Sequence, residues 1–407
     1  MTLIAAFVAW LSLASVVLAL LYRESMLAAW EEPVLRCPIL ILESDDWGYG
    51  PSTQAERLDR IADALAGVRD GAGRNPVVTL GVILAGPDTQ RIRDGGGRLY
   101  HRLSLDDLRF APIREAMLRG SARGVFALQL HGMEHFRPAT LMRQAGDPAI
   151  RAWLTGDSPP PTEDLPPPLQ SRWIDAGVLP SALLSESEVL EATAEEAAAF
   201  AAIFGTAPEV VVPTTFVWTA GVERGWSRAG LSVVVTPGRR NESRDAGGEI
   251  VPGRTQCFNG QTAAGALTYV VRDAYFEPAL GHTAERALAA LRARALCGRP
   301  ALLEMHRFNF LEPDTADKTL AELRALLRSA IAALPTLRFM STAELAQQYR
   351  ERSSLLERRT GARVHFFIRR MAEVSRLRKL AWATGAALPA WLTYVLTRPG
   401  PEPSPAR

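Results

Sequence analysis

Two short stretches of the chain place acidic and imidazole side chains at a spacing that can bind a metal ion. They are Glu43-Ser44-Asp45-Asp46-Trp47-Gly48 and His131-Gly132-Met133-Glu134-His135. Residues four apart share one side of a helical turn, so His131 and His135 can face one ligand. Together with a carboxylate from a neighbouring strand they would offer two nitrogens and one oxygen. Such a set leaves a coordination position for water, as catalytic rather than structural sites do.

Each stretch alone also has a simpler explanation. Paired acids at the start of a loop commonly cap a helix or close a turn, because Asp accepts hydrogen bonds from free backbone N–H groups. The chain has six histidines, and His306 follows a third apolar run, in Glu304-Met305-His306-Arg307. A lone histidine there could simply pack. The coincidence of three such stretches favours a functional site, whereas His101, His282 and His365 indicate surface or packing positions.

The elements that must position these residues alternate between short apolar runs and helical patterns. Predicted strands are 38–46, 76–85, 124–130, 209–213, 231–236, 267–271 and 301–305, and predicted helices are 54–69, 105–119, 186–204, 284–295 and 314–333. Runs that are apolar at successive positions suit strands covered on both faces. The alternation predicts one α/β domain, either a doubly wound sheet or, as we favour, a distorted β/α barrel of about seven strands. Both architectures place the active site at the carboxyl ends of the strands.

The barrel is expected to span residues 34–349, with one unusually long connection. Residues 136–184 contain two triple prolines, at 159–161 and 166–168. A connection of this length in a compact domain is typically functional or disordered. Because it follows the third predicted strand, it would form a lid or groove wall beside the two histidines. A capping box, Ser341 with Glu344, predicts one further helix after the last strand.

The N-terminal segment, residues 1–22, is expected to be a membrane anchor. From Thr2 to Leu21 twenty residues carry no charge, which is about the length of a spanning helix. A cleaved signal peptide is the alternative, but the segment lacks a basic start and a small-x-small cleavage pattern. Arg23 and Arg36 follow the segment, which favours a cytoplasmic domain by the positive-inside rule.

Residues 350–407 predict a basic, amphipathic helical extension. Between Arg363 and Lys379 six basic residues face one acid, and eighteen uncharged residues follow up to Thr397. Such a segment can lie on a membrane surface with its arginines at the headgroups. A second spanning helix and a helix docked on the protein body are the alternatives.

Composition excludes several protein classes. Of 407 residues 47% are apolar and 22% charged, with 46 basic against 44 acidic side chains and three cysteines. Disordered chains and disulfide scaffolds have other compositions. The net charge of +2 gives no argument for a nucleic-acid partner, and we expect none.

The pattern resembles the polysaccharide deacetylases, carbohydrate esterase family four, over about residues 34–349. The family's paired acids are matched by Asp45-Asp46, its His-x-x-x-His by His131 and His135, and its late histidine by His306. The resemblance implies a distorted β/α barrel of about seven strands that binds a divalent metal, zinc or a similar ion. It implies Asp46, His131 and His135 as metal ligands, Asp45 as the catalytic base and His306 as the catalytic acid.

The third motif departs from the family's pattern. The family has an arginine before a proline-aromatic turn, but the matching stretch from Val211 to Trp218 contains none. Arg307, beside His306, is the candidate to replace it and to contact substrate. The Asp-Asp-Trp-Gly form of the first motif also indicates a divergent branch. Aromatic rings stack on sugar faces, so Trp47 and Trp218 are the further candidate substrate-binding residues.

The resulting hypothesis is a membrane-anchored metal-dependent hydrolase of carbohydrate amide bonds. It would remove an N-acyl group, in the first place acetyl, from amino sugars of a polysaccharide or lipid-linked glycan. Metal-bound water would attack, and a backbone N–H near Thr215 or Phe216 would help hold the oxyanion. Two alternatives are a glycoside hydrolase using Asp45 or Asp46 with Glu304, and a non-catalytic polysaccharide-binding or assembly protein. Exported polysaccharide as substrate favours an extracytoplasmic catalytic domain, against the charge rule.

Overall fold

A curved parallel sheet forms the centre of the molecule in the computed structural model, which describes residues 2–157 and 159–398. The strand order is β12-β7-β6-β5-β2-β1-β14-β13, with β15 paired to β1. The strands are β1 (Ile39–Gly48), β2 (Val78–Ile83), β5 (Phe126–Leu130), β6 (Val210–Val211), β7 (Val233–Thr236), β12 (Thr268–Val271), β13 (Ala274–Tyr275), β14 (Ala301–His306) and β15 (Arg338–Phe339). Each of the seven predicted runs contains a strand.

The two ends of this sheet belong to one piece of chain. Only Arg272 and Asp273 separate β12 from β13, yet β12 pairs with β7 and β13 with β14. The sheet therefore curls into a distorted β/α barrel, which confirms the predicted fold class. Its carboxyl strand ends gather the residues described below.

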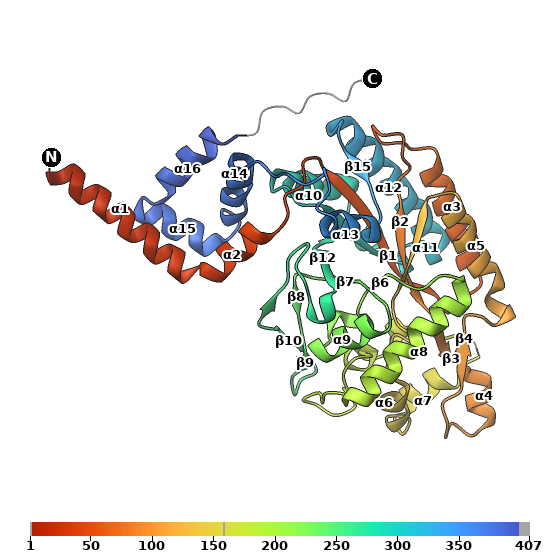
Figure 1. The fold of residues 1–407 in the computed structure, drawn as a ribbon. Coiled ribbons are helices and arrows are strands. Elements are labelled where there is room, and N and C mark those ends of the chain that lie inside the picture. The colour runs from red at the N-terminus through yellow and green to blue at the C-terminus, as the bar shows by residue number, and fades with distance from the viewer. Residues whose placement is uncertain (1, 158, 399–407) are drawn as a thin grey trace.

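Helices cover the outside of the barrel (Figure 1). They are α3 (Gln54–Ala66), α5 (Ala111–Ala122), α8 (Glu186–Phe204), α9 (Ala220–Arg228), α10 (Ala284–Leu296), α11 (Phe308–Leu311), α12 (Pro313–Ala333) and α13 (Thr342–Arg350). Capping boxes begin α8 at Ser185 and α13 at Ser341, because each serine and the glutamate three residues on satisfy free backbone N–H groups. Leucines of α12 such as Leu323 and Leu327 are fully buried in the main core.

The proline-rich connection is ordered into short elements, apart from residue 158, which lies outside the described part. They are α6 (Pro138–Arg143), α7 (Pro148–Leu154) and the 3₁₀ turns η2 (Thr162–Asp164) and η3 (Pro167–Gln170). Phe136, Leu141, Ile150 and Leu165 pack into a small core of their own. This local core explains why a connection with two triple prolines holds one shape.

Smaller elements decorate the barrel. Antiparallel pairs join β3 (Ala85–Pro87) to β4 (Arg102–Ser104), β8 (Arg239–Arg240) to β11 (Thr255–Gln256), and β9 (Ser243–Arg244) to β10 (Ile250–Val251). The remaining short helices are α4 (Thr89–Asp94), η1 (Leu108–Phe110), η4 (Thr214–Phe216), η5 (Ala264–Ala266) and η6 (Pro278–Leu280).

Helices from both ends of the chain pack together beside the barrel (Figure 1). They are α1 (Thr2–Leu21), α2 (Arg23–Glu31), α14 (Thr360–Met371), α15 (Ser375–Thr384) and α16 (Ala387–Leu396). The buried Arg370 of α14 joins the two ends, since it donates to the carbonyl oxygens of Ala29, Glu32 and Cys297. Within the described residues, one helix is long and apolar enough to cross a membrane, Leu3–Leu21, a property shared by anchors and signal sequences. Residues 399–407 of the predicted extension lie outside the described part.

Candidate metal centre

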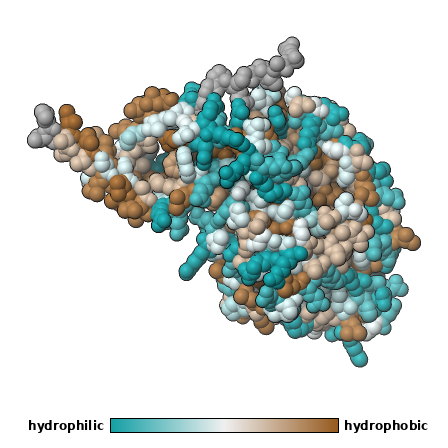
Figure 2. Space-filling view, in the orientation of Figure 1, coloured by the Kyte–Doolittle hydropathy of each residue, from teal (hydrophilic) through white to brown (hydrophobic). Residues whose placement is uncertain are grey.

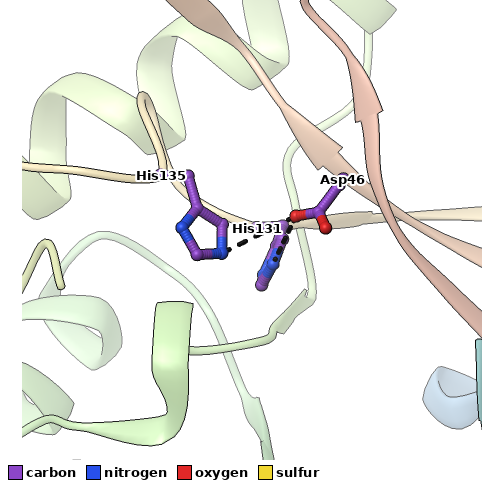
Figure 3. Close-up of side chains that lie close together, drawn as sticks. All are labelled: Asp46, His131 and His135. Carbon is purple, nitrogen blue, oxygen red and sulfur yellow. Dashed lines mark ion pairs between the residues drawn. The ribbon is translucent and has the colours of Figure 1, made fainter. Parts of the chain in front are cut away.

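Asp46, His131 and His135 converge at the carboxyl ends of β1 and β5 (Figure 3). Asp46 Oδ1 lies 3.3 Å from His131 Nε2 and 3.6 Å from His135 Nε2. All three residues are buried, and one donor atom of each lies within 4.8 Å of the others. The proposed metal ligands are thus brought together by two strands that are both hydrogen-bonded to β2.

A bulge in β1 turns two consecutive acids into the same pocket. Ser44 pairs with Leu80 and Trp47 with Val82, so β1 contains one residue more than β2 between these points. Asp46 has a φ of 70°, a left-handed conformation that non-glycine residues rarely adopt. Successive strand residues normally face opposite sides, but the extra residue lets both Asp45 and Asp46 line the pocket.

The imidazoles are oriented for binding a cation through Nε2. His131 Nδ1 lies 2.9 Å from the carbonyl oxygen of Val212, a partner that holds the proton on Nδ1. Burial lowers the pKa of His135 to about 4, which keeps this ring neutral. Burial also disfavours charge on His131, but the carboxylates of Asp45 and Asp46 raise its pKa above the usual value. This upward shift reports a negative potential where a cation would sit.

The donor set fits a divalent transition metal. Asp46 Oδ1 is buried without a hydrogen-bond partner, although it faces two imidazole nitrogens. Ligands about 2.1 Å from a tetrahedral ion lie about 3.4 Å apart, close to the two observed separations. Asp45, Glu304 and His306 form a second cluster in the same pocket. Arg272 contacts both acids of that second cluster and so disfavours a cation there.

Arg272 holds the charge on Asp45. Its Nη2 lies 2.7 Å from Asp45 Oδ2, with both side chains 1% exposed. Burial would raise the pKa of Asp45, but the Arg272 guanidinium brings it below the usual value. Arg272 follows β12 directly, so the guanidinium beside Asp45 comes from another strand end than the third motif. Arg307, the residue predicted for this place, meets Asp45 through its backbone N–H, which donates to the Asp45 carbonyl oxygen.

Arg272 also neutralises two further buried acids. Its guanidinium lies 3.3 Å from Glu43 and 3.3 Å from Glu304, and it stacks over the Phe216 ring at 5.0 Å. Burial raises the pKa of both glutamates, against the attraction of Arg272. The Arg272 guanidinium therefore contacts three carboxyl groups inside the barrel, and these contacts fix the position of the guanidinium from several sides.

His306 lies beside Asp45 at the end of the neighbouring strand β14. Its Nδ1 lies 2.6 Å from Glu277 Oε1, and its Nε2 lies 3.6 Å from Glu304. Burial disfavours the charged ring, but the contact with Glu277 and the nearby acids raise its pKa to about 10. Glu277 is itself 3% exposed and also accepts from Asn309. Glu277 and Arg272 are the functional candidates that sequence reasoning missed, and both lie just after predicted strand 267–271.

The three predicted substrate-binding residues do not line the pocket. Trp47 and Trp218 are 0% exposed in the core, where their indoles donate to Ser44 and Glu223. Arg307 is 3% exposed and donates to the carbonyl oxygen of Tyr49. The two indoles turn into the core, which argues against direct substrate contact by Trp47 and Trp218. Arg307 holds the loop after β1, and its Nη2 lies 3.5 Å from the pocket residue Glu163.

Other residues form the walls of the pocket, which has a volume of about 290 Å³. Phe216 and Phe308 are its aromatic lining, and Thr162, Glu163 and Gln170 reach it from the proline-rich connection. Phe308 stacks on His306 with ring centroids 5.9 Å apart. The Phe216 N–H donates to Pro213 at 3.1 Å and is not free to hold an oxyanion, which leaves Thr215 of the two predicted donors.

Glu134, between His131 and His135 in the sequence, makes structural contacts. It is 0% exposed and pairs with Arg172 at 2.8 Å and with Arg102 at 2.5 Å. Arg172, in the proline-rich connection, also contacts Glu196 of α8 at 3.2 Å. The loop that carries His131 and His135 is thereby tied to the connection and to α8.

Comparisons with known proteins find similarity in solved structures. No protein-family model matches the chain, and no curated protein matches it. A family 4 carbohydrate esterase from Streptomyces lividans, in complex with acetate, is 12% identical and covers 75% of this chain and 94% of its own, with a TM-score of 0.34. A peptidoglycan deacetylase from Bacillus subtilis is 10% identical and covers 79% of this chain and 94% of its own, with a TM-score of 0.35. A 4-alpha-glucanotransferase from Thermococcus litoralis is 11% identical and covers 78% of this chain and 40% of its own, with a TM-score of 0.38.

Proposed function

We propose that this protein is a metal-dependent hydrolase that removes an N-acyl group, in the first place acetyl, from amino sugars of a polysaccharide or lipid-linked glycan. The observation that carries the proposal is that the pocket holds a set of metal-binding side chains next to two separate groups that can accept and donate protons. A buried carboxylate and two imidazoles form an open donor set, and beside it lie Asp45, paired with Arg272, and His306, paired with Glu277. The resemblance of these motifs to polysaccharide deacetylases supports the same reaction.

Asp46, His131 and His135 would hold the ion, for which the donor set suits zinc. A bound divalent ion supplies Lewis-acid chemistry, which lowers the pKa of water and polarises the acyl carbonyl. The protein contributes by orienting the side chains that would bind the ion. The Val212 carbonyl fixes the His131 ring, and the β1 bulge fixes Asp46.

Asp45 would act as the base that accepts the proton of the attacking water. A base must be unprotonated at the working pH, and the ion pair with Arg272 supplies this by lowering the pKa of Asp45. Arg272 does not reach out toward solvent, since it is 2% exposed. It is a positioning residue that acts through Asp45.

His306 would act as the acid that protonates the leaving amine. Its Nδ1 proton is directed to Glu277, which leaves Nε2–H to donate into the pocket. One proton must leave the attacking water oxygen and one must reach the departing amine nitrogen, and two groups placed at these two atoms can perform the two transfers. Asp45 and His306 would be these two groups, on the neighbouring strands β1 and β14.

Phe216 and Phe308 replace the predicted tryptophans as the apolar walls of the site. Aromatic faces contact the C–H faces of sugars and small acyl groups. We propose that these two rings hold the acyl methyl group or the sugar face, while the proline-rich connection bounds the pocket through Glu163 and Gln170.

The direct test measures acetate release from N-acetylglucosamine oligomers by the full-length protein in detergent. We expect release that stops after chelation and returns when zinc is added, and that is lost in Asp46→Ala. His101→Ala, outside both metal-ligand clusters, serves as the matched control and should keep its activity. Chelator-resistant cleavage of the glycosidic bonds would instead establish a glycoside hydrolase. Glycan binding without turnover in the zinc-loaded protein would establish a binding protein.

We also propose that α1 is a retained membrane anchor and that the barrel lies on the extracytoplasmic side, where exported polysaccharide is found. Arg23 and Arg36 after α1 are the opposing observation. Fusions at the C-terminus test the side. Alkaline phosphatase should be active and green fluorescent protein dark, and the reverse result would place the barrel in the cytoplasm.

A further inference from the structure

Helices α15 and α16 form a hairpin whose turn contacts the middle of α1. Trp10 Nε1 donates to the carbonyl oxygen of Thr384 at 3.0 Å. Gly385 forms the turn with a φ of 82°, and a Cβ there would lie 3.1 Å from Leu11 Cδ2. Trp10 and Leu11 lie near the middle of α1, which runs from Thr2 to Leu21. The hairpin therefore runs alongside α1 and ends halfway along it.

The start of the hairpin lies level with the end of α1. Leu377 and Leu18 belong to one buried apolar cluster together with Met371 and Ala386. Eight residues separate Leu18 from Trp10, a distance of about 12 Å along a helix. The bilayer core is about 30 Å thick. A spanning α1 would thus carry the hairpin turn nearly to the middle of the membrane.

The charged residues of the hairpin lie only at the level where α1 ends. Its three basic residues, Arg376, Arg378 and Lys379, lie in the first half of α15, next to the end of α1. From Leu380 to Thr397 no residue is charged. This order places basic side chains where lipid headgroups would be and uncharged ones at greater depth.

The surface of the hairpin is apolar and open. Trp382, Trp391, Leu392 and Leu396 are 53 to 76% exposed. An apolar groove of about 390 Å³ lies between α1, α14, α15 and α16. In Figure 2 the apolar surface gathers on the arm formed by these helices. Soluble proteins rarely expose contiguous apolar surface of this extent.

The threonine hydroxyl groups of the hairpin and the carbonyl oxygen of Tyr394 are paired within the protein. The hydroxyl groups of Thr384, Thr393 and Thr397 each donate to the carbonyl oxygen four residues earlier. His365 Nδ1 of α14 lies 2.9 Å from the carbonyl oxygen of Tyr394, whose ring stacks on the imidazole. Segments in hydrocarbon need this internal pairing because lipid tails offer no partners.

We propose that α15 and α16 are a re-entrant hairpin that enters the lipid bilayer beside α1 and turns back at mid-depth, with Arg376, Arg378 and Lys379 at the headgroups. The proposal rests on α1 as a retained span and is independent of the reaction at the metal centre. We propose that lipid covers the open apolar surface of the hairpin, because this surface continues the exposed face of α1 at the same depth.

Spin labels on the full-length protein test the proposal in vesicles of three parts phosphatidylcholine to one part phosphatidylglycerol. Labels go on Leu388→Cys and Leu392→Cys in α16, on Val17→Cys as the α1 reference, and on Leu108→Cys as the aqueous reference, because Leu108 is 84% exposed on the barrel. Labelled wild type gives the background from the native cysteines. We expect both α16 labels to collide with oxygen at least as often as the Val17 label, and with a water-soluble nickel chelate no more often, because they lie at least as deep as Val17.

Two outcomes would overturn the proposal. If the α16 labels collide with the nickel chelate as often as the Leu108 label while the Val17 label does not, α1 spans and the hairpin lies in water. If the α16 labels are shielded from both agents and the protein cross-links as a dimer, a second copy covers the surface. Each variant must keep the wild-type melting temperature, and the two α16 positions must agree.

Discussion

The Arg272 guanidinium lies 2.7 Å from the Asp45 carboxylate, at the point where the barrel closes. Arg272 belongs to the two-residue link between β12 and β13, and Asp45 belongs to the bulge of β1. Strand β14 lies between β13 and β1 in the sheet. The charge of the proposed base therefore depends on barrel closure as well as on the strand that carries it.

Replacing Arg272 should change the pH dependence of the reaction. Without the guanidinium the pKa of Asp45 rises, so the base becomes protonated at a higher pH and the acidic limb of the kcat/KM profile moves upward. Loss of a general base typically lowers kcat about 10² to 10⁴-fold. Arg272→Met should show both effects, whereas Arg272→Lys should keep part of the charge and a smaller shift. An unmoved acidic limb in a folded Arg272→Met protein would argue against this role.

Glu277→Gln should change the alkaline limb of the kcat/KM profile. Contact with Glu277 raises the pKa of His306 to about 10 against the effect of burial. His306 must be protonated to act as the acid, so a lower pKa removes the acid form at a lower pH. The alkaline limb should therefore move down while the acidic limb stays. The pH profile of acetate release checks this, and an alkaline limb identical to wild type would contradict it.

Gly81→Ala should displace the proposed base, Asp45, without altering any proposed metal ligand. A Cβ at Gly81 would lie 2.3 Å from Asp45 Oδ1, so the carboxylate must move. A displacement of about 1 Å in an active site can lower the rate about 10²-fold. Gly67→Ala is the matched control, because a Cβ there meets nothing within 4 Å. Steady-state kcat of the two variants, beside their zinc content, distinguishes a moved base from a lost metal.

Arg172→Met should destabilise the fold around the metal ligands. It leaves the buried Glu196 without its cation, and it leaves the buried Glu134 with Arg102 alone. Breaking a buried pair in this way lowers the free energy of unfolding by about 3 to 5 kcal/mol. Arg119→Met, which breaks an exposed pair with Asp59, should change it by no more than about 1 kcal/mol. Thermal unfolding in detergent compares the two, and equal melting temperatures would contradict the assigned place of Arg172.

The strands could be predicted because local sequence determines them, and so could the approach of the three proposed metal ligands, which follow those strands. Apolar runs end in polar residues wherever a buried strand meets the pocket, and the capping boxes at Ser185 and Ser341 mark their helices directly. The convergence of Asp46, His131 and His135 follows from parallel strands ending at one edge of the sheet.

What could not be predicted depends on contacts between distant segments. The bulge that turns Asp45 and Asp46 to one side is set by pairing with β2, which no local pattern reports. The partner of Asp45 depends on barrel closure, so the sequence near His306 pointed to Arg307, whereas Arg272 is the arginine that contacts the Asp45 carboxylate. Trp47 and Trp218 showed that an indole beside a catalytic motif can as easily face the core.

The central claim, a metal held by Asp46, His131 and His135, is tested most directly by elemental analysis. The full-length wild-type protein is purified in detergent, equilibrated with excess zinc and freed of unbound ion, beside an Asp46→Ala/His131→Ala double variant and a His101→Ala control. The account predicts about one ion per chain in the wild type and the control and none in the folded double variant. A folded wild-type protein that retains no divalent ion, or a double variant that retains as much as the wild type, would contradict it.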